Sequence, residues 1–265
     1  ILIGLVGSEM CIRDRYTYID AAKSKGYNVL LMDGQLDVPM INMLEQKFEK
    51  SHFTRVDSDV IDRLIVKEDQ KSEELADTKR EILSTVFSGQ LPKVQKTEFH
   101  VETQAMGETA APIVITQAEY MRRMKEMANI QPGMSFYGEM PSMFNLVLNS
   151  DHRLIKQVLE DAESACSEKL VPVESEIAML KLRENELHKA HEGKKDEEIP
   201  TTEKDELHDV EKKLDEQKKQ KTDIINEYAA GNKVVHQLID LALLQNNMLK
   251  GEALTNFVKR SIELI

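Results

Sequence analysis

The spacing of apolar residues between positions 151 and 228 constrains the fold of this chain more than any other feature. A first set follows a spacing of four, three and seven residues, the a/d rhythm of a coiled coil, and consists of Val173, Ile177, Leu180 and Leu187. A second set lies beyond a break at 193–200 and consists of Leu207, Val210, Leu214 and Ile225. The two sets predict an antiparallel helical hairpin at about residues 160–228. At a rise of 1.5 Å per residue, its arms extend about 40–60 Å.

The segments on either side of this hairpin mix helices and strands, which predicts an α+β fold. Residues 16–66 contain a helix stopped by Gly26, a short apolar run at 28–32 typical of a buried strand, and a helix at 39–48. This α/β fragment is too short to be a complete doubly wound domain, so we expect it to close a domain that begins upstream.

The following segment predicts a mixed domain of helices and three strands. Strands are expected at 96–103, 112–115 and 144–148, and helices at 75–87, 117–129, 232–250 and 252–265. The helix at 117–129 is preceded by Thr116 and followed three residues later by Glu119, a capping box. The last two helices carry more apolar surface than one neighbour would bury, which indicates an interface.

The first fifteen residues are interpreted as foreign to the protein. Residues 5–14 resemble one reading frame of a transposase adapter used in sequencing libraries, and the segment lacks the charge pattern of a secretory signal. The alternative is a buried edge strand. The fold is therefore predicted from Tyr16 onward.

Charge and cysteine content exclude several classes of partner. The net charge of -12 argues against nucleic acid and against binding to an anionic membrane through a basic patch. No apolar run reaches the roughly 18 residues that span a bilayer. Outside the first fifteen residues the only cysteine is Cys166, which indicates a reducing compartment and a cytoplasmic location.

Three stretches, in the same order along the chain, resemble the ninety-kilodalton heat-shock chaperones in their bacterial form, the high-temperature protein G type. Residues 25–32 with Leu36 and Asp37 resemble a strand and turn near the end of the family's middle domain. Residues 144–154 resemble the strand-to-helix junction of the C-terminal domain, and residues 257–260 resemble its last helix. The resemblance covers residues 16–160 and 230–265, without a motif as specific as a phosphate-binding loop.

The resemblance implies a domain plan and a function. Residues 16–70 are the end of a middle domain, and 71–265 are a dimerisation domain into which the hairpin is inserted. The family consists of ATP-dependent chaperones of the stress response, which form homodimers through a four-helix bundle and bind unfolded client proteins. ATP and Mg²⁺ belong to the family's N-terminal domain, which we expect to be missing here. The chain is therefore expected to be neither an enzyme nor a cofactor-binding protein.

The same resemblance directs attention to two groups of residues. Residues expected to contact clients form a Met-rich set: Tyr120, Met121, Met124, Met127, Met140 and Met143. Composition alone favours the alternative that the helical members face the core. Residues expected at the dimer interface are Leu238, Leu241, Leu244, Leu254, Phe257, Val258 and Ile262.

Other candidate sites have simpler interpretations. His188, His191 and His208 with Glu192 offer zinc ligands if the hairpin turns near Glu198, but we expect solvated histidines and no metal. Cys166 is expected to pack between helices, and Asp57, Asp59 and Asp62 lack the spacing of a calcium loop.

Two other functions compete with that of a chaperone. The chain could instead be a structural coiled-coil adaptor that works through the hairpin at 160–228. A hydrolase built on residues 16–66 has little support, because that segment has no pair of nucleophile and base.

Overall fold

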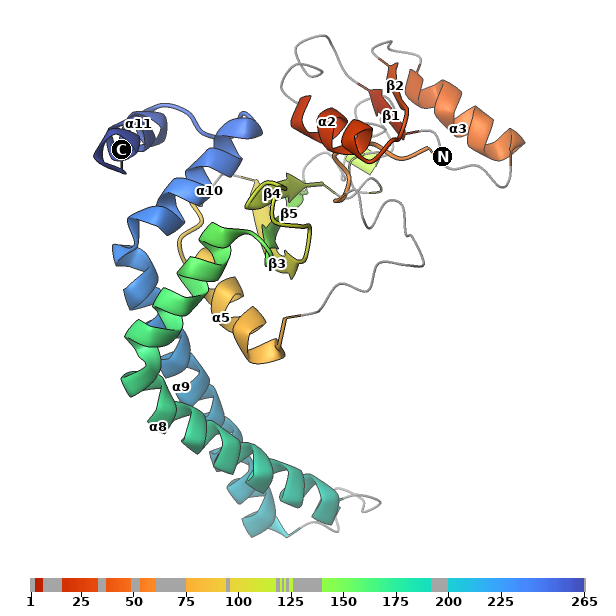
Figure 1. Ribbon diagram of the computed structural model, residues 1–265. Coiled ribbons are helices and arrows are strands. Elements are labelled where there is room, and N and C mark those ends of the chain that lie inside the picture. The colour runs from red at the N-terminus through yellow and green to blue at the C-terminus, as the bar shows by residue number, and fades with distance from the viewer. Residues whose placement is uncertain are drawn as a thin grey trace. The chain divides into compact units, whose positions relative to one another are not determined.

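The computed structural model describes residues 3–6, 16–32, 37–48, 53–60, 75–93, 96–117, 120, 122, 124–125, 140–191 and 200–264. Its elements belong to two compact units (Figure 1). The first unit contains Ile1–Val158 and Lys233–Ile265, and the second contains Leu159–Asn232. The α+β class with a long helical hairpin is confirmed.

The N-terminal elements are α2 (Tyr16–Ser24), β2 (Val29–Met32) and α3 (Asp37–Lys47). Helix α2 ends at Ser24, just before the predicted stop residue Gly26, whose φ of +80° is a left-handed conformation that glycine adopts without a steric penalty. Strand β1 (Ile3–Val6) pairs in parallel with β2. The assignment of residues 1–15 to an adapter stays a prediction.

The expectation that β2 is a buried strand is wrong in part. Met32 is buried, but Leu30 and Leu31 are 42% and 54% exposed. The physical reason is that β2 belongs to a sheet of two strands, and among the described residues α2 is the helix that packs against it. An apolar run predicts a strand, but not how many layers cover it.

Residues 53–60 join these elements to the second sheet. Val56 packs with Ile19 and Ala22 in a small core. Beside it, the guanidinium of Arg55, which is 4% exposed, binds Asp57 through Nε–Oδ1 and Nη2–Oδ2 contacts of 2.7 and 2.6 Å. The carbonyl of Asp57 accepts a hydrogen bond from the amide of Gln117 at 3.2 Å. Asp57 therefore has a structural role.

The second sheet contains β3 (Thr97–Gln104), β4 (Ile113–Thr116) and β5 (Ser142–Asn149), all close to their predicted positions. Its order is β3-β5-β4, with β5 parallel to β3 and antiparallel to β4. Helix α5 (Asp77–Ser88) packs against β3. Residues 146–149 of the central strand are all buried, so both faces of the sheet are covered there.

The junction between β5 and α8 (Arg153–His191) is organised by a buried amide. Asn149 is 0% exposed, and its Oδ1 accepts hydrogen bonds from the amides of Met106 and Asp151, both at 3.1 Å. Its Nδ2 donates to the carbonyls of Gly107 at 2.8 Å and Ala111 at 3.3 Å. One side chain thus fixes the loop between β3 and β4 against the start of α8.

The predicted hairpin is formed by α8 and α9 (Thr201–Gly231). Both predicted seams lie inward, since Val173, Ile177 and Leu187 of α8 and Val210, Leu214 and Ile225 of α9 are buried. Cys166 is also buried, as expected of a packing residue, and this burial raises the pKa of its thiol. The N-cap of α9 is Pro200.

The chain continues with α10 (Lys233–Gln245) and α11 (Glu252–Leu264). Helix α10 packs against β4 and α5 through Val235, Leu238, Ile239, Ala242 and Leu243. Within the described residues, every helix is too short or too polar to cross a bilayer.

Candidate functional site

Polar side chains hold α11 against α10. The guanidinium of Arg260 contacts the carboxylate of Asp240, and each side chain is only 18% exposed. Arg260 also donates from Nε to Oε1 of Gln237 at 3.0 Å, and Gln237 donates from Nε2 to the hydroxyl of Ser261 at 2.6 Å. The polar side of α11 therefore faces its own chain.

A fourth contact, between Lys233 and Glu263, joins the start of α10 to the end of α11. The Nζ–Oε2 distance is 2.8 Å, and the hydrogen bond from Lys233 lowers the pKa of the Glu263 carboxyl. Both groups are exposed, so the pair adds little stability.

The apolar side of α11 faces away from its own chain. Leu254, Val258 and Ile262 follow one another at intervals of four residues, so they form one stripe on the helix. They are 37%, 49% and 71% exposed. We call them, together with the exposed Leu241 and Leu244 of α10, the C-terminal apolar surface. Such a large exposed apolar set is typical of an interface.

Two other residues of the predicted dimer interface differ from this surface. Phe257 is half-buried beside the stripe. Leu238 is 5% exposed and belongs to the face of α10 that packs on its own chain. Leu238 is therefore a core residue of the single chain.

The Met-rich set is described only in part. Tyr120 is 68% exposed and Met143 is 49% exposed, whereas Met124 and Met140 are half-buried. Met121 and Met127 lie outside the described residues. Lys125 donates from Nζ to the hydroxyl of Ser142 at 2.7 Å, which brings the turn that carries Met124 against the start of β5. Among the four members that the structure describes, Tyr120 and Met143 are thus the exposed ones.

The capping box predicted at Thr116 is not seen. Thr116 is the last residue of β4, and its Oγ1 is buried without a hydrogen-bond partner in the described part of the chain. Its expected partner, Glu119, lies outside the described residues. The strand places the hydroxyl in the core, where it does not act as a helix cap.

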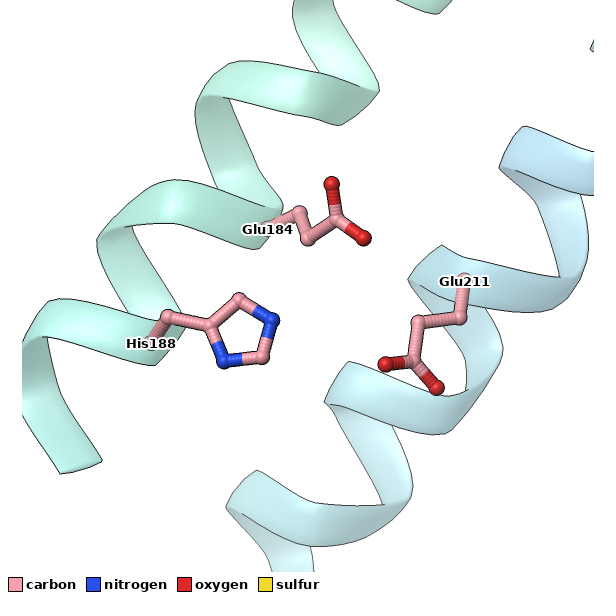
Figure 2. Close-up of side chains that lie close together, drawn as sticks. All are labelled: Glu184, His188 and Glu211. Carbon is pink, nitrogen blue, oxygen red and sulfur yellow. The ribbon is translucent and has the colours of Figure 1, made fainter. Parts of the chain in front are cut away.

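The histidines of the hairpin do not gather as a group. His191 Nε2 lies 3.1 Å from Oε2 of Glu203. The groups that converge with His188 are Glu184 and Glu211 (Figure 2), whereas Glu192 lies outside the described residues. Neither Glu184 nor Glu211 was among the ligands predicted from the sequence. For Glu211 the reason is that the register between the two helices decides which residue of α9 faces His188.

Comparisons with known proteins agree with the resemblance seen in the sequence. The profile of the family described as "Hsp90 protein" matches residues 5–172. The "Chaperone protein HtpG" of Bacteroides fragilis strain ATCC 25285 is 68% identical over 252 residues, which is 95% of this chain. The protein of the same name is 66% identical in Bacteroides thetaiotaomicron and 45% identical in Porphyromonas gingivalis strain W83.

The coverage of these matches bears on the hairpin. This chain spans 37% of the length of each relative. Because each match takes in 95% of this chain, most of the hairpin must have a counterpart in all three relatives. The family profile, by contrast, ends at residue 172, within α8. The distal hairpin is thus shared with these relatives but lies outside the stretch that the profile matches.

Proposed function

Because this chain belongs to the Hsp90 protein family, we propose that it is the dimerising, client-holding part of a bacterial chaperone. The relatives that it matches are named chaperones, and this chain corresponds to 37% of their length. Under this proposal ATP and Mg²⁺ act in another part of the full-length relatives, and the chain itself holds clients without catalysing a reaction. A cytoplasmic location is part of the same proposal.

The observation that carries this proposal is the C-terminal apolar surface. Polar contacts to α10 orient α11 so that Leu254, Val258 and Ile262 are left exposed. A second copy would bury the same stripe by symmetry, because an interface with a two-fold axis uses one patch twice. Stable interfaces bury about 1,200–2,000 Å² in total, which two helices per protomer are long enough to supply.

We expect light scattering to report a dimer for the full chain, and a monomer after Val258→Asp with Ile262→Asp. Each new carboxylate would be buried without a partner in the dimer, at a cost of several kcal/mol. Leu182→Asp is the matched control, because Leu182 is 66% exposed on the hairpin. The control must remain dimeric. A double variant that still dimerises would disprove this interface.

Client binding is assigned to the exposed residues Tyr120 and Met143. Both are large side chains that are exposed and contribute little to the core. Their replacement should therefore change the stability of the folded chain only slightly. Met is flexible and polarizable, so a surface that contains it adapts to varied apolar segments. Two such surfaces in one dimer would raise the effective concentration of the second contact with a client.

Suppression of the aggregation of a denatured protein tests this assignment. We expect Tyr120→Ser with Met143→Ser to weaken suppression several-fold while the dimer persists. Met179→Ser is the control, because Met179 is 65% exposed on the hairpin. Equal suppression by the double variant and the control would move client binding elsewhere.

A coiled-coil adaptor is the second candidate function, and one observation favours it. Val171, Met179 and Leu182 lie on α8 and are 61%, 65% and 66% exposed. These side chains are outside the buried seam of the hairpin, so they are available to a partner helix.

A further inference from the structure

Complementary charges join the two arms of the hairpin along its length. Near its base, Lys169 and Glu227 are 2.8 Å apart, and further out Lys221 and Glu174 are 3.1 Å apart. The guanidinium of Arg183 binds Glu206 at 2.6 Å, and His191 lies 3.1 Å from Glu203. In each of these four contacts a group that carries, or on protonation gains, a positive charge on one arm faces a carboxylate on the other.

One level of the hairpin departs from this pattern. Glu184 and His188 of α8 are four residues apart, on one face of the helix, and Glu211 of α9 lies opposite them. One ligand atom from each of the three side chains lies within 4.8 Å of the others. Figure 2 shows the three side chains reaching toward one another across the space between the helices.

The two carboxylates at this level are not paired with any basic side chain that the structure describes. Across the described residues, neither Glu184 nor Glu211 forms an ion pair or a hydrogen bond, although the next arginine along α8, Arg183, binds Glu206. Like charges so close together repel each other. A cation between them would replace this repulsion with attraction to both.

We propose that Glu184, His188 and Glu211 bind a divalent transition-metal ion, for which Zn²⁺ is the probe, and that the ion joins the two arms of the hairpin. Two carboxylate oxygens and one imidazole nitrogen are suitable ligands for Zn²⁺. Three protein ligands leave a fourth position for water. The imidazole distinguishes this site from a purely acidic cluster, which would prefer Ca²⁺ or Mg²⁺.

The geometry requires only a small adjustment of side chains. Bonds of about 2.0–2.2 Å around a tetrahedral ion place the ligand atoms about 3.3–3.6 Å apart. The three ligand atoms lie within 4.8 Å of one another, so they need to approach by at most about 1.5 Å. His188 is exposed and Glu184 is half-buried, so the side chains are free to move and the ion has access from solvent.

Bound metal would stabilise the distal half of the hairpin. An ion that binds only when α8 and α9 are correctly aligned stabilises that alignment, because the unfolded chain does not present the three ligands together. The hairpin would thus have a distal half whose stiffness depends on metal supply. This inference does not depend on the chaperone assignment, since it concerns only the hairpin.

Calorimetric titration of the full chain with Zn²⁺, after treatment with a chelator, tests the site. We expect one ion per chain, and at least about ten-fold weaker binding in His188→Gln and in Glu211→Gln, since removal of even an indirect partner of a metal typically costs 10–100-fold. The control is His208→Gln, because His208 is exposed on α9 one turn from Glu211. It should bind as tightly as the unchanged chain.

A second measurement separates metal binding from an effect on folding. Saturating Zn²⁺ should raise the temperature at which helical circular dichroism is lost in the unchanged chain and in His208→Gln, but not in His188→Gln. Absence of binding would overturn the proposal. Binding that survives in both ligand variants, or that Mg²⁺ displaces at equal concentration, would overturn it as well.

Discussion

Asn149 is the residue on which the junction of β5 and α8 most depends. It is fully buried, and its amide forms four hydrogen bonds that satisfy two backbone N–H groups and two carbonyls of the surrounding loops. No aliphatic residue of similar size can replace both the donor and the acceptor. The form of the junction therefore depends on this side chain.

Asn149→Ala should destabilise the second sheet by about 2–4 kcal/mol, because it leaves buried backbone groups without partners. Hydrogen exchange measures this locally, as faster exchange of the amides of β5 and of Met106. The hairpin, which belongs to the other compact unit, should exchange as before.

Asp151→Ala is the matched control at this junction. The carboxylate of Asp151 accepts one hydrogen bond, from the amide of Gly107 at 2.8 Å, in an exposed position. Its loss should cost no more than about 1.5 kcal/mol, the usual net value of one such bond. Equal effects of the two substitutions would mean that the burial of Asn149 does not matter.

At the scale of elements, sequence periodicity predicted what depends on local spacing. The seams of α8 and α9 are buried as expected, because each follows from the positions of apolar residues along a single helix. The same argument did not separate Leu238 from Leu241 in α10. Both lie in an apolar helix, and only the tertiary packing of α10 decides which of them is buried.

The candidate sites were less predictable, because they depend on register and on layers. Glu211 faces His188 only through the alignment of two helices, which the residue types do not specify. Leu30 and Leu31 predicted a buried strand, yet they are exposed in a two-stranded sheet. Local patterns therefore indicated the kind of each element, whereas the partners of each face came from tertiary structure.

Helix α8 contains an unfavourable residue in its interior. Pro172 is exposed, and α8 continues through it from Arg153 to His191. Proline has no N–H to donate to the carbonyl four residues earlier, and its ring crowds that carbonyl. Pro172→Ala should therefore stabilise the hairpin by up to about 3 kcal/mol.

Thermal unfolding followed by helical circular dichroism measures this gain. Lys181→Ala is a suitable control, because Lys181 is exposed on the same helix. This substitution replaces one good helix former with another. It should leave the transition almost unchanged. A lower transition temperature for Pro172→Ala would show that a bend at Pro172 is required for the two arms to pack.

At the scale of the whole molecule, the family profile matches residues 5–172, whereas most of the hairpin and both C-terminal helices, α10 and α11, lie beyond that stretch. The profile ends at residue 172, and the second compact unit, Leu159–Asn232, contains the hairpin. The C-terminal apolar surface and the exposed pair Tyr120 and Met143 belong to the first unit. The chaperone proposal therefore needs only the first unit, whereas the adaptor proposal needs the second.

A shortened hairpin separates these two proposals. Glu174 and Lys221 are joined across the arms by a contact of 3.1 Å, so a short glycine-rich linker can replace residues 175–220 without displacing the retained turns. Lys169 and Glu227, 2.8 Å apart, remain to align the base of the hairpin.

If the chain is a chaperone, light scattering should still report a dimer for the shortened chain. Its suppression of aggregation should stay within about two-fold of that of the full chain, because both proposed surfaces are intact. If suppression is lost while the dimer persists, the working surface lies on the distal hairpin, where Met179 and Leu182 are exposed, and the adaptor function gains the support that the chaperone function loses.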